Sequence, residues 1–97
     1  MLDTFVSMDL IEAQIDIGVV MFDGHVLELF VTSSERFHVR LLTVTVSGAD
    51  KKGRRRVTLA QPGNISELLL DEAEFEGLQP IFEALRAAGV KMLSREG

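Results

Sequence analysis

Hydrophobic and polar residues alternate along the first half of the chain with the period of β-strands. Over residues 13–21, every second position belongs to one apolar side, formed by Ala13, Ile15, Ile17, Val19 and Met21. A period of two is typical of a strand with one buried face. The dipeptide Asp23-Gly24 then separates this run from a second one at 25–32. Because Asp-Gly suits a tight turn with positive φ, the pattern predicts a β-hairpin.

Four more short runs continue the pattern of strands. They lie at residues 36–39, 41–46, 54–60 and 65–70. Clusters of turn-forming residues at 47–53 and 62–64 separate the later runs. We therefore expect several antiparallel strands, joined by short connections.

The period changes to that of a helix near the end of the chain. Phe75, Leu78, Phe82 and Leu85 recur at spacings of three, four and three, which places them on one helical stripe. Pro80 fits best in the first turn of a helix. We predict a short helical turn at 72–76 and a main helix at about 79–88.

Both ends of this helical region carry recognisable signals. Asp71 and Glu74 have the spacing of a capping box, and Gly89 suits the position after the last helical residue. Residues 90–93 are predicted to form an extra strand or a docked tail. Residues 2–12 are expected to be irregular or to form a short helix.

The order of these elements resembles the pleckstrin-homology-like (PH-like) fold, especially its short bacterial versions. The resemblance rests on the early hairpin Phe22-Asp23-Gly24-His25-Val26-Leu27-Glu28-Leu29, on the run 36–46 and on the closing helix at 78–89. The resemblance covers residues 13–89. We predict that the whole chain, residues 1–97, forms a single domain. The resemblance implies an α+β fold, an antiparallel barrel or sandwich of about six or seven strands capped by a C-terminal amphipathic helix.

Two features set this chain apart from many PH-like domains. It has no Trp for the closing helix, where Phe82 takes that volume, and the tip of its first hairpin at 22–25 is acidic where phosphoinositide-binding members place basic residues. Phosphoinositide binding at that hairpin is therefore not expected. A ferredoxin-like α+β sandwich is the competing fold, but it needs a helix between early strands, and residues 22–46 offer no pattern for one.

Composition narrows the class of protein. Hydrophobic residues make up 46% of the 97 positions, which favours a packed core over disorder. There is no Cys, so disulfides, thiolate nucleophiles and Cys-based zinc sites are excluded. With no apolar run long enough to span a bilayer and no signal-peptide pattern at the start, we expect a cytoplasmic location and no transmembrane segment.

The basic residues are concentrated in one tract. The formal net charge is −5, yet five of the ten bases lie within six positions, namely Lys51, Lys52, Arg54, Arg55 and Arg56. This tract is a candidate site for an anion, such as an anionic lipid surface or an acidic partner. The other interpretation is a solvated hairpin tip whose charges prevent aggregation. The overall acidity disfavours nucleic acid.

The sequence offers no recognisable catalytic group. His25 and His38 lie 13 positions apart with no third His, so neither a metal site nor a cofactor is expected. No Ser lies in a Gly-x-Ser-x-Gly motif. We predict that the protein is not an enzyme. If it were a small enzyme with an unrecognised site, His25, His38 and Arg40 would be the residues to inspect.

A second apolar strand face is the remaining candidate surface. Val20, Phe22, Val26 and Phe30 are predicted to share a face opposite the main core. Such a face needs a cover, which the N-terminal segment or a second copy of the chain could supply. The leading hypothesis is therefore a non-catalytic binding or scaffolding module that acts through protein–protein contact, as a self-associating homodimer or with another protein. Anion or membrane-surface binding through residues 51–56 is the alternative.

Overall fold

Two four-stranded β-sheets and two short helices make up the computed structural model, which describes residues 10–31 and 34–95. The first sheet, called sheet A, contains β1 (Ile11–Ile15), β2 (Gly18–Phe22), β3 (Val26–Phe30) and β4 (Ser34–His38), in chain order. The second, sheet B, has the order β7 (Asn64–Leu70), β6 (Arg55–Gln61), β5 (Thr43–Ser47) and β8 (Lys91–Arg95). All pairings are antiparallel except that β8 runs parallel to β5. The predicted mostly antiparallel α+β fold is thus confirmed.

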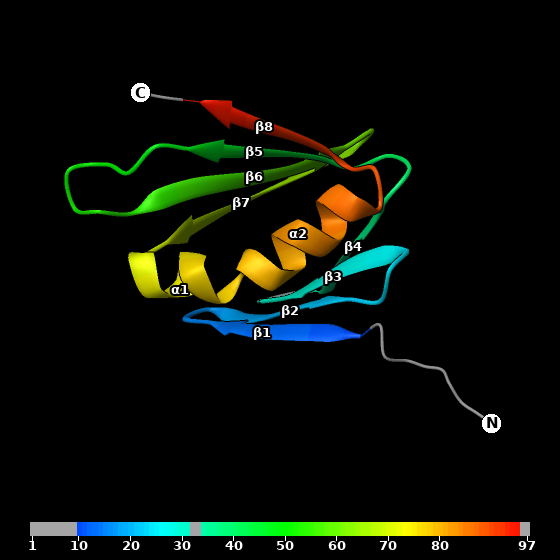
Figure 1. Ribbon diagram of the computed structural model, residues 1–97, viewed down its shortest axis with the longest axis horizontal. Coiled ribbons are helices and arrows are strands. Elements are labelled where there is room, and N and C mark those ends of the chain that lie inside the picture. The colour runs from blue at the N-terminus through cyan, green and yellow to red at the C-terminus, as the bar shows by residue number, and fades with distance from the viewer. Residues whose placement is uncertain (1–9, 32–33, 96–97) are drawn as a thin grey trace.

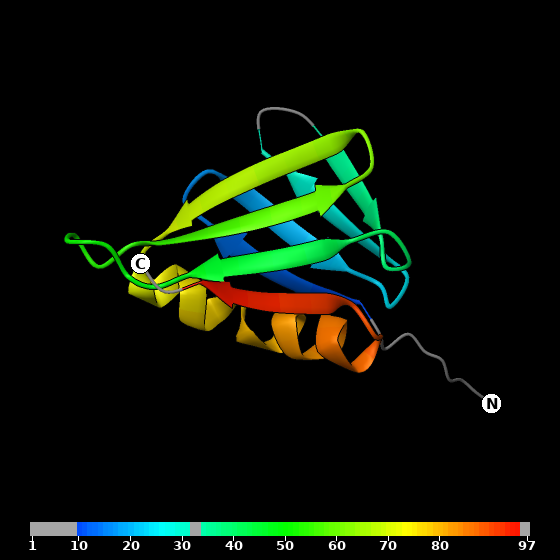
Figure 2. The same cartoon turned by 90° about the horizontal axis from the view of Figure 1, so that it is seen from above.

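The two sheets lie on opposite sides of one hydrophobic core (Figure 1). Helices α1 (Glu72–Gly77) and α2 (Gln79–Ala87) run along one side of the space between the sheets, beside β1 and β8 (Figure 2). The apolar stripe of α2 supplies Ile81, Phe82 and Leu85 to the core. Burying this stripe removes it from water, which is the main contribution of the helix to stability.

The first predicted strand is divided in two by a turn. Ile15 pairs with Gly18, so Asp16 and Ile17 form a two-residue hairpin connection inside what was predicted to be one strand over residues 13–21. The turn also changes which positions of the second strand face the core, because paired residues in an antiparallel hairpin lie on the same face. This division and the pairing of β8 give eight strands instead of the six or seven that the sequence pattern indicates.

The Asp23-Gly24 hairpin is confirmed, with a longer loop than predicted. Phe22 pairs with Leu27, so the connection is longer than a two-residue turn. The Asp23 carboxylate accepts hydrogen bonds from the backbone N–H groups of His25 and Val26, both at 2.8 Å. Gly24 adopts φ of 100°, which a residue with a side chain rarely does. An Asx-type turn, rather than a minimal hairpin turn, therefore reverses the chain here.

The helical region follows the sequence prediction closely. The Asp71 side chain accepts from the Glu74 N–H at 2.8 Å, and the Glu74 side chain accepts from the Asp71 N–H at 3.0 Å, which completes the capping box. Gly89 ends the second helix with φ of 90°. The helix is not the last element, however, because β8 follows it and adds to sheet B. Of the two structures predicted for residues 90–93, an extra strand or a docked tail, the strand is confirmed from Lys91 onward.

Candidate binding surfaces

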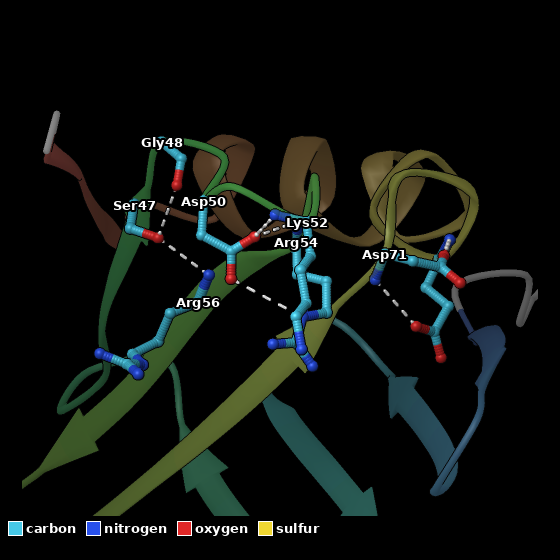
Figure 3. A network of polar contacts seen from close by, with 8 residues as sticks. Ser47, Gly48, Asp50, Lys52, Arg54, Arg56 and Asp71 are labelled. Atoms are coloured by element: carbon cyan, nitrogen blue, oxygen red, sulfur yellow. Dashed lines mark hydrogen bonds and ion pairs between the residues drawn. The ribbon is translucent and has the colours of Figure 1, made fainter.

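The basic tract, residues 51–56, covers the second half of the connection between β5 and β6 and the first two residues of β6. This connection is built around Asp50 (Figure 3). The carboxylate of Asp50 accepts hydrogen bonds from the backbone N–H groups of Lys52 at 2.8 Å and Arg54 at 2.9 Å. The Arg54 hydrogen bond is the main cause that lowers the pKa of Asp50 below its usual value of 3.8. Lys51 and Lys52 are exposed at the tip of this loop. An acidic residue thus organises the loop that carries the cations.

The three arginines of the tract point to different neighbours. The Nε atom of Arg54 lies 3.6 Å from the Asp50 carboxylate. The guanidinium of Arg55 lies 4.8 Å from the centroid of the Phe75 ring, at a distance suited to a cation–π contact. The Nε atom of Arg56 lies 3.8 Å from Glu67 of β7.

Successive residues of a strand face opposite sides, so Arg55 and Arg56 cannot point into one site. The structure therefore divides the predicted anion-binding residues among three contacts and an exposed tip. Side chains of the same protein already neutralise part of their charge, which weakens the case for an anion site across all five.

An open cleft of about 490 Å³ lies between the β1–β2 turn and the start of α1. Its lining includes Asp16, Ile17, Arg54, Asp71 and Glu74. The Glu74 carboxylate also accepts a hydrogen bond from the backbone N–H of Asp16, in addition to its capping contact with Asp71. The carboxylate of Glu74 therefore holds the turn against the helix. Sequence reasoning found this residue only as a helix cap, since its contact with Asp16 joins positions 58 apart in the chain.

The histidines lie near each other at one end of sheet A. The backbone carbonyl of His25 accepts from the Val39 N–H at 2.9 Å, and the Nδ1 of His38 accepts from the Arg40 N–H at 3.2 Å. Both histidines are exposed. Over residues 10–31 and 34–95, no group of three or more His, Asp or Glu side chains is arranged to hold a metal ion. The side chain of His38 thus contacts the backbone of its own turn.

The predicted second apolar face exists, but two of its four residues were assigned to the wrong side. Val20 and Phe22 are only 2% exposed and pair with Leu29 and Leu27, so they lie in the core. The turn at residues 16–17 causes the error, because it exchanges the inward and outward positions of β2. A surface interface in the folded protein cannot therefore include Val20 or Phe22.

The outward side of sheet A carries a different set of apolar residues, which we call the outer apolar face. Its members are Val19, Met21, Val26 and Phe30. The first three are half-buried and Phe30 is 36% exposed. Among the described residues, the half-buried hydrophobic side chains that pack against the core do not include them. The outer apolar face is thus separate from the core and lies on the surface.

One row of residues across the middle of the outer apolar face contains three charged side chains and one apolar side chain. The register of the four strands places Glu12, Met21, Glu28 and Arg36 side by side, from β1 to β4. The Nε atom of Arg36 lies 3.4 Å from the Glu28 carboxylate. The row therefore ends in an acid on β1 and in a base on β4.

Comparison of the chain with protein-family models, with curated proteins and with solved structures finds no match. Neither α1 nor α2, the two helices of the described part of the chain, has the length and the apolar composition that a bilayer crossing requires.

Proposed function

We propose that this chain is a non-catalytic protein-binding module that forms a homodimer through the outer apolar face of sheet A. The observation that carries the proposal is the position of Val19, Met21, Val26 and Phe30 on the surface, turned away from the core. Apolar residues gathered on one exposed sheet face are typical of a surface that another protein covers.

A second copy fits this face because the face is complementary to itself. Two sheets pack face to face with their strands within about 30° of each other. A two-fold axis in the plane of contact and along the strands would place β1 over β4 of the second copy and β2 over β3. Glu12 would then oppose Arg36 of the second copy, and Val19 would oppose its Phe30. Opposite charges thus meet at the two rims and Val19 meets Phe30. In the middle of the contact, Met21 would lie over Glu28 of the second copy, whose carboxylate lies 3.4 Å from the Nε atom of Arg36 in its own copy.

The fold supports a further part of the proposal, that the domain is PH-like. A four-stranded antiparallel meander, three more antiparallel strands and the two helices α1 and α2 follow one another in the described chain. This is the order that the resemblance implies, with β8 as an additional strand at the edge of sheet B. The proposed function does not depend on this relationship, because one fold serves many functions.

The oligomeric state tests the proposed dimer. We expect light scattering behind size exclusion to give the mass of a dimer at about 100 μM protein, the range of a weak to moderate association. Phe30→Glu should give a monomer, since it buries a charge in the contact. Ile65→Glu is the matched control, because Ile65 is a 69% exposed apolar residue on sheet B. A monomeric wild-type protein, or a dimer that survives Phe30→Glu, would contradict the proposal.

Cysteine cross-linking tests the orientation of the dimer, because the native chain contains no Cys. The double variant Glu12→Cys/Arg36→Cys should form covalent dimers with a short bifunctional thiol reagent, because packed sheets lie about 10 Å apart, which is too far for a direct disulfide. Within one copy the two positions lie on β1 and β4, three strand spacings apart at about 4.8 Å each, which is too far for the same short reagent. Glu12→Cys alone should stay uncross-linked. Efficient linkage of that single variant would instead place β1 over β1 and refute the proposed axis.

A further inference from the structure

A second surface lies at one edge of sheet B, along β8. The strand β8 pairs with β5 on one side, and no strand of the described chain pairs with its other side. The carbonyl of Arg95 accepts from the Gly48 N–H at 2.8 Å, so the backbone of Arg95 points toward the β5 side. Backbone groups alternate in direction along a strand. Met92 and Ser94 therefore turn their N–H and C=O groups toward the free edge.

The side chains beside this edge form an alternating pattern of charge and apolar surface. Lys91, Leu93 and Arg95 share the outward side of β8, and all three are exposed, with Leu93 at 42%. Their neighbours on β5 are Thr43, Thr45 and Ser47, which carry no charge. The edge therefore presents a cation, an apolar residue and a cation at successive outward positions, without an acidic residue across from them on β5.

A second copy of β8 is a poor partner for this edge. If two copies paired in antiparallel register around Leu93, Lys91 of one copy would lie opposite Arg95 of the other. Like charges directly opposite each other destabilise a strand pair, and edge lysines commonly prevent such pairing in monomeric proteins. A strand with acidic residues at these positions would instead attract both Lys91 and Arg95.

We propose that the β8 edge binds an extended acidic segment of another protein, which adds to sheet B as a fifth strand. The segment would carry an acidic, an apolar and an acidic residue at alternate positions, opposite Lys91, Leu93 and Arg95. Its backbone would hydrogen-bond to Met92 and Ser94, and its side chains would give the specificity, as in other cases of strand addition. This edge belongs to sheet B, so the inference stands independently of the dimer proposed through sheet A.

A synthetic peptide provides the probe. The acetylated and amidated heptapeptide Thr-Glu-Thr-Val-Thr-Glu-Thr has the required alternation. We expect it to bind the wild-type protein with a Kd in the range of about 0.1–1 mM, as seen by NMR, because short edges offer few hydrogen bonds. The largest amide shifts should fall on Met92 and Ser94. The same peptide with Lys in place of Glu should bind at least about tenfold more weakly, since both cross-strand charge pairs become repulsive.

A modified peptide and a variant of the protein separate strand addition from simple charge attraction. A peptide N-methylated on the amides that face β8 keeps its charge but cannot donate hydrogen bonds, and it should not bind measurably. The double variant Lys91→Glu/Arg95→Glu should lose the acidic peptide and gain the Lys peptide. Equal binding of the N-methylated peptide, shifts centred on residues 51–56, or no binding at 5 mM peptide (about five times the weakest expected Kd) would each overturn the proposal. The peptide comparison uses wild-type protein, so it stays decisive even if the double variant folds poorly.

Discussion

Gly18 is the position where the structure predicts the sharpest effect of one added methyl group. It begins β2, directly after the turn that divides the first predicted strand. A Cβ atom built on Gly18 would lie 1.9 Å from the carbonyl oxygen of Phe30 and 3.0 Å from the Cα of Val31. Carbon and carbonyl oxygen atoms approach to roughly 3.3 Å in strand pairs. The Gly18→Ala variant would therefore have to move β2 and β3 apart by roughly 1.4 Å at this end.

The displaced atoms belong to the backbone, which cannot rotate away as a flexible side chain would. Overpacking of this kind costs about 1–3 kcal/mol, and sometimes more. The whole domain is expected to be stable by only about 5–15 kcal/mol. For a domain of this length, each kcal/mol corresponds to a shift in Tm of roughly 4–8 °C. Gly18→Ala should therefore lower the Tm by about 4 °C at the least, and by more than 10 °C near the upper end of the range.

Urea and thermal denaturation, followed by circular dichroism, measure this effect. Gly77→Ala is the matched control, because Gly77 lies at the end of α1 and a Cβ there meets nothing within 4 Å. That control should be neutral or stabilise by up to about 1 kcal/mol, since Ala reduces the entropy of the unfolded chain. Suppose that Gly18→Ala had the same free energy of unfolding as the wild type, and that the two proteins showed the same slope of this free energy with urea concentration. The close approach of β2 and β3 would then be refuted.

Two more predictions concern the core and the β2–β3 loop. Leu85→Ala removes a side chain of α2 that is 0% exposed, and it should destabilise the protein by about 2–5 kcal/mol in urea denaturation, whereas the exposed Glu83→Ala should change stability by less than about 0.5 kcal/mol. The N–H of Val26, and next that of His25, lower the pKa of Asp23 below its usual 3.8 in the folded protein. A folded pKa below the unfolded one means that this contribution to stability is present above pH 3.8 and is lost as the pH falls through the folded pKa. Titration of the Asp23 carboxyl by NMR should give a value under 3.8, and Asp23→Asn should remove that part of the acid sensitivity. A midpoint at or above 3.8 would contradict it.

The sequence predicted those features that depend on neighbouring residues and missed those that depend on one turn. The capping box of Asp71 and Glu74 and the stop at Gly89 were found because each depends on a local hydrogen bond or dihedral angle. The turn at residues 16–17 contains Asp16 and is followed by Gly18, both turn-forming residue types, but the alternation of apolar and polar positions continues through them and masks this signal. One missed turn was enough to place Val20 and Phe22 on the surface, because the period of a strand is two.

The basic tract shows a different limit. Its five cations are close in sequence, and sequence proximity suggested one site. The structure separates them because a strand turns successive side chains to opposite faces, so that Arg55 contacts Phe75 while Arg56 contacts Glu67. These contacts join β6 to α1 and to β7, and no local pattern encodes them. Conversely, the two cations of β8, Lys91 and Arg95, lie four positions apart and form no cluster in the sequence, although they share one side of an open edge.

The two proposed surfaces differ in a way that makes them compatible. The outer apolar face ends in an acid on one side and in a base on the other, so it is complementary to itself and favours a closed dimer. The β8 edge carries Lys91 and Arg95 without an acid, so it repels its own copy and favours a different, acidic partner. Because the two sheets lie on opposite sides of the molecule (Figure 1), a dimer through sheet A would leave both β8 edges open. Such a dimer would present two sites to a partner, and a partner with two acidic segments would gain affinity from binding both at once.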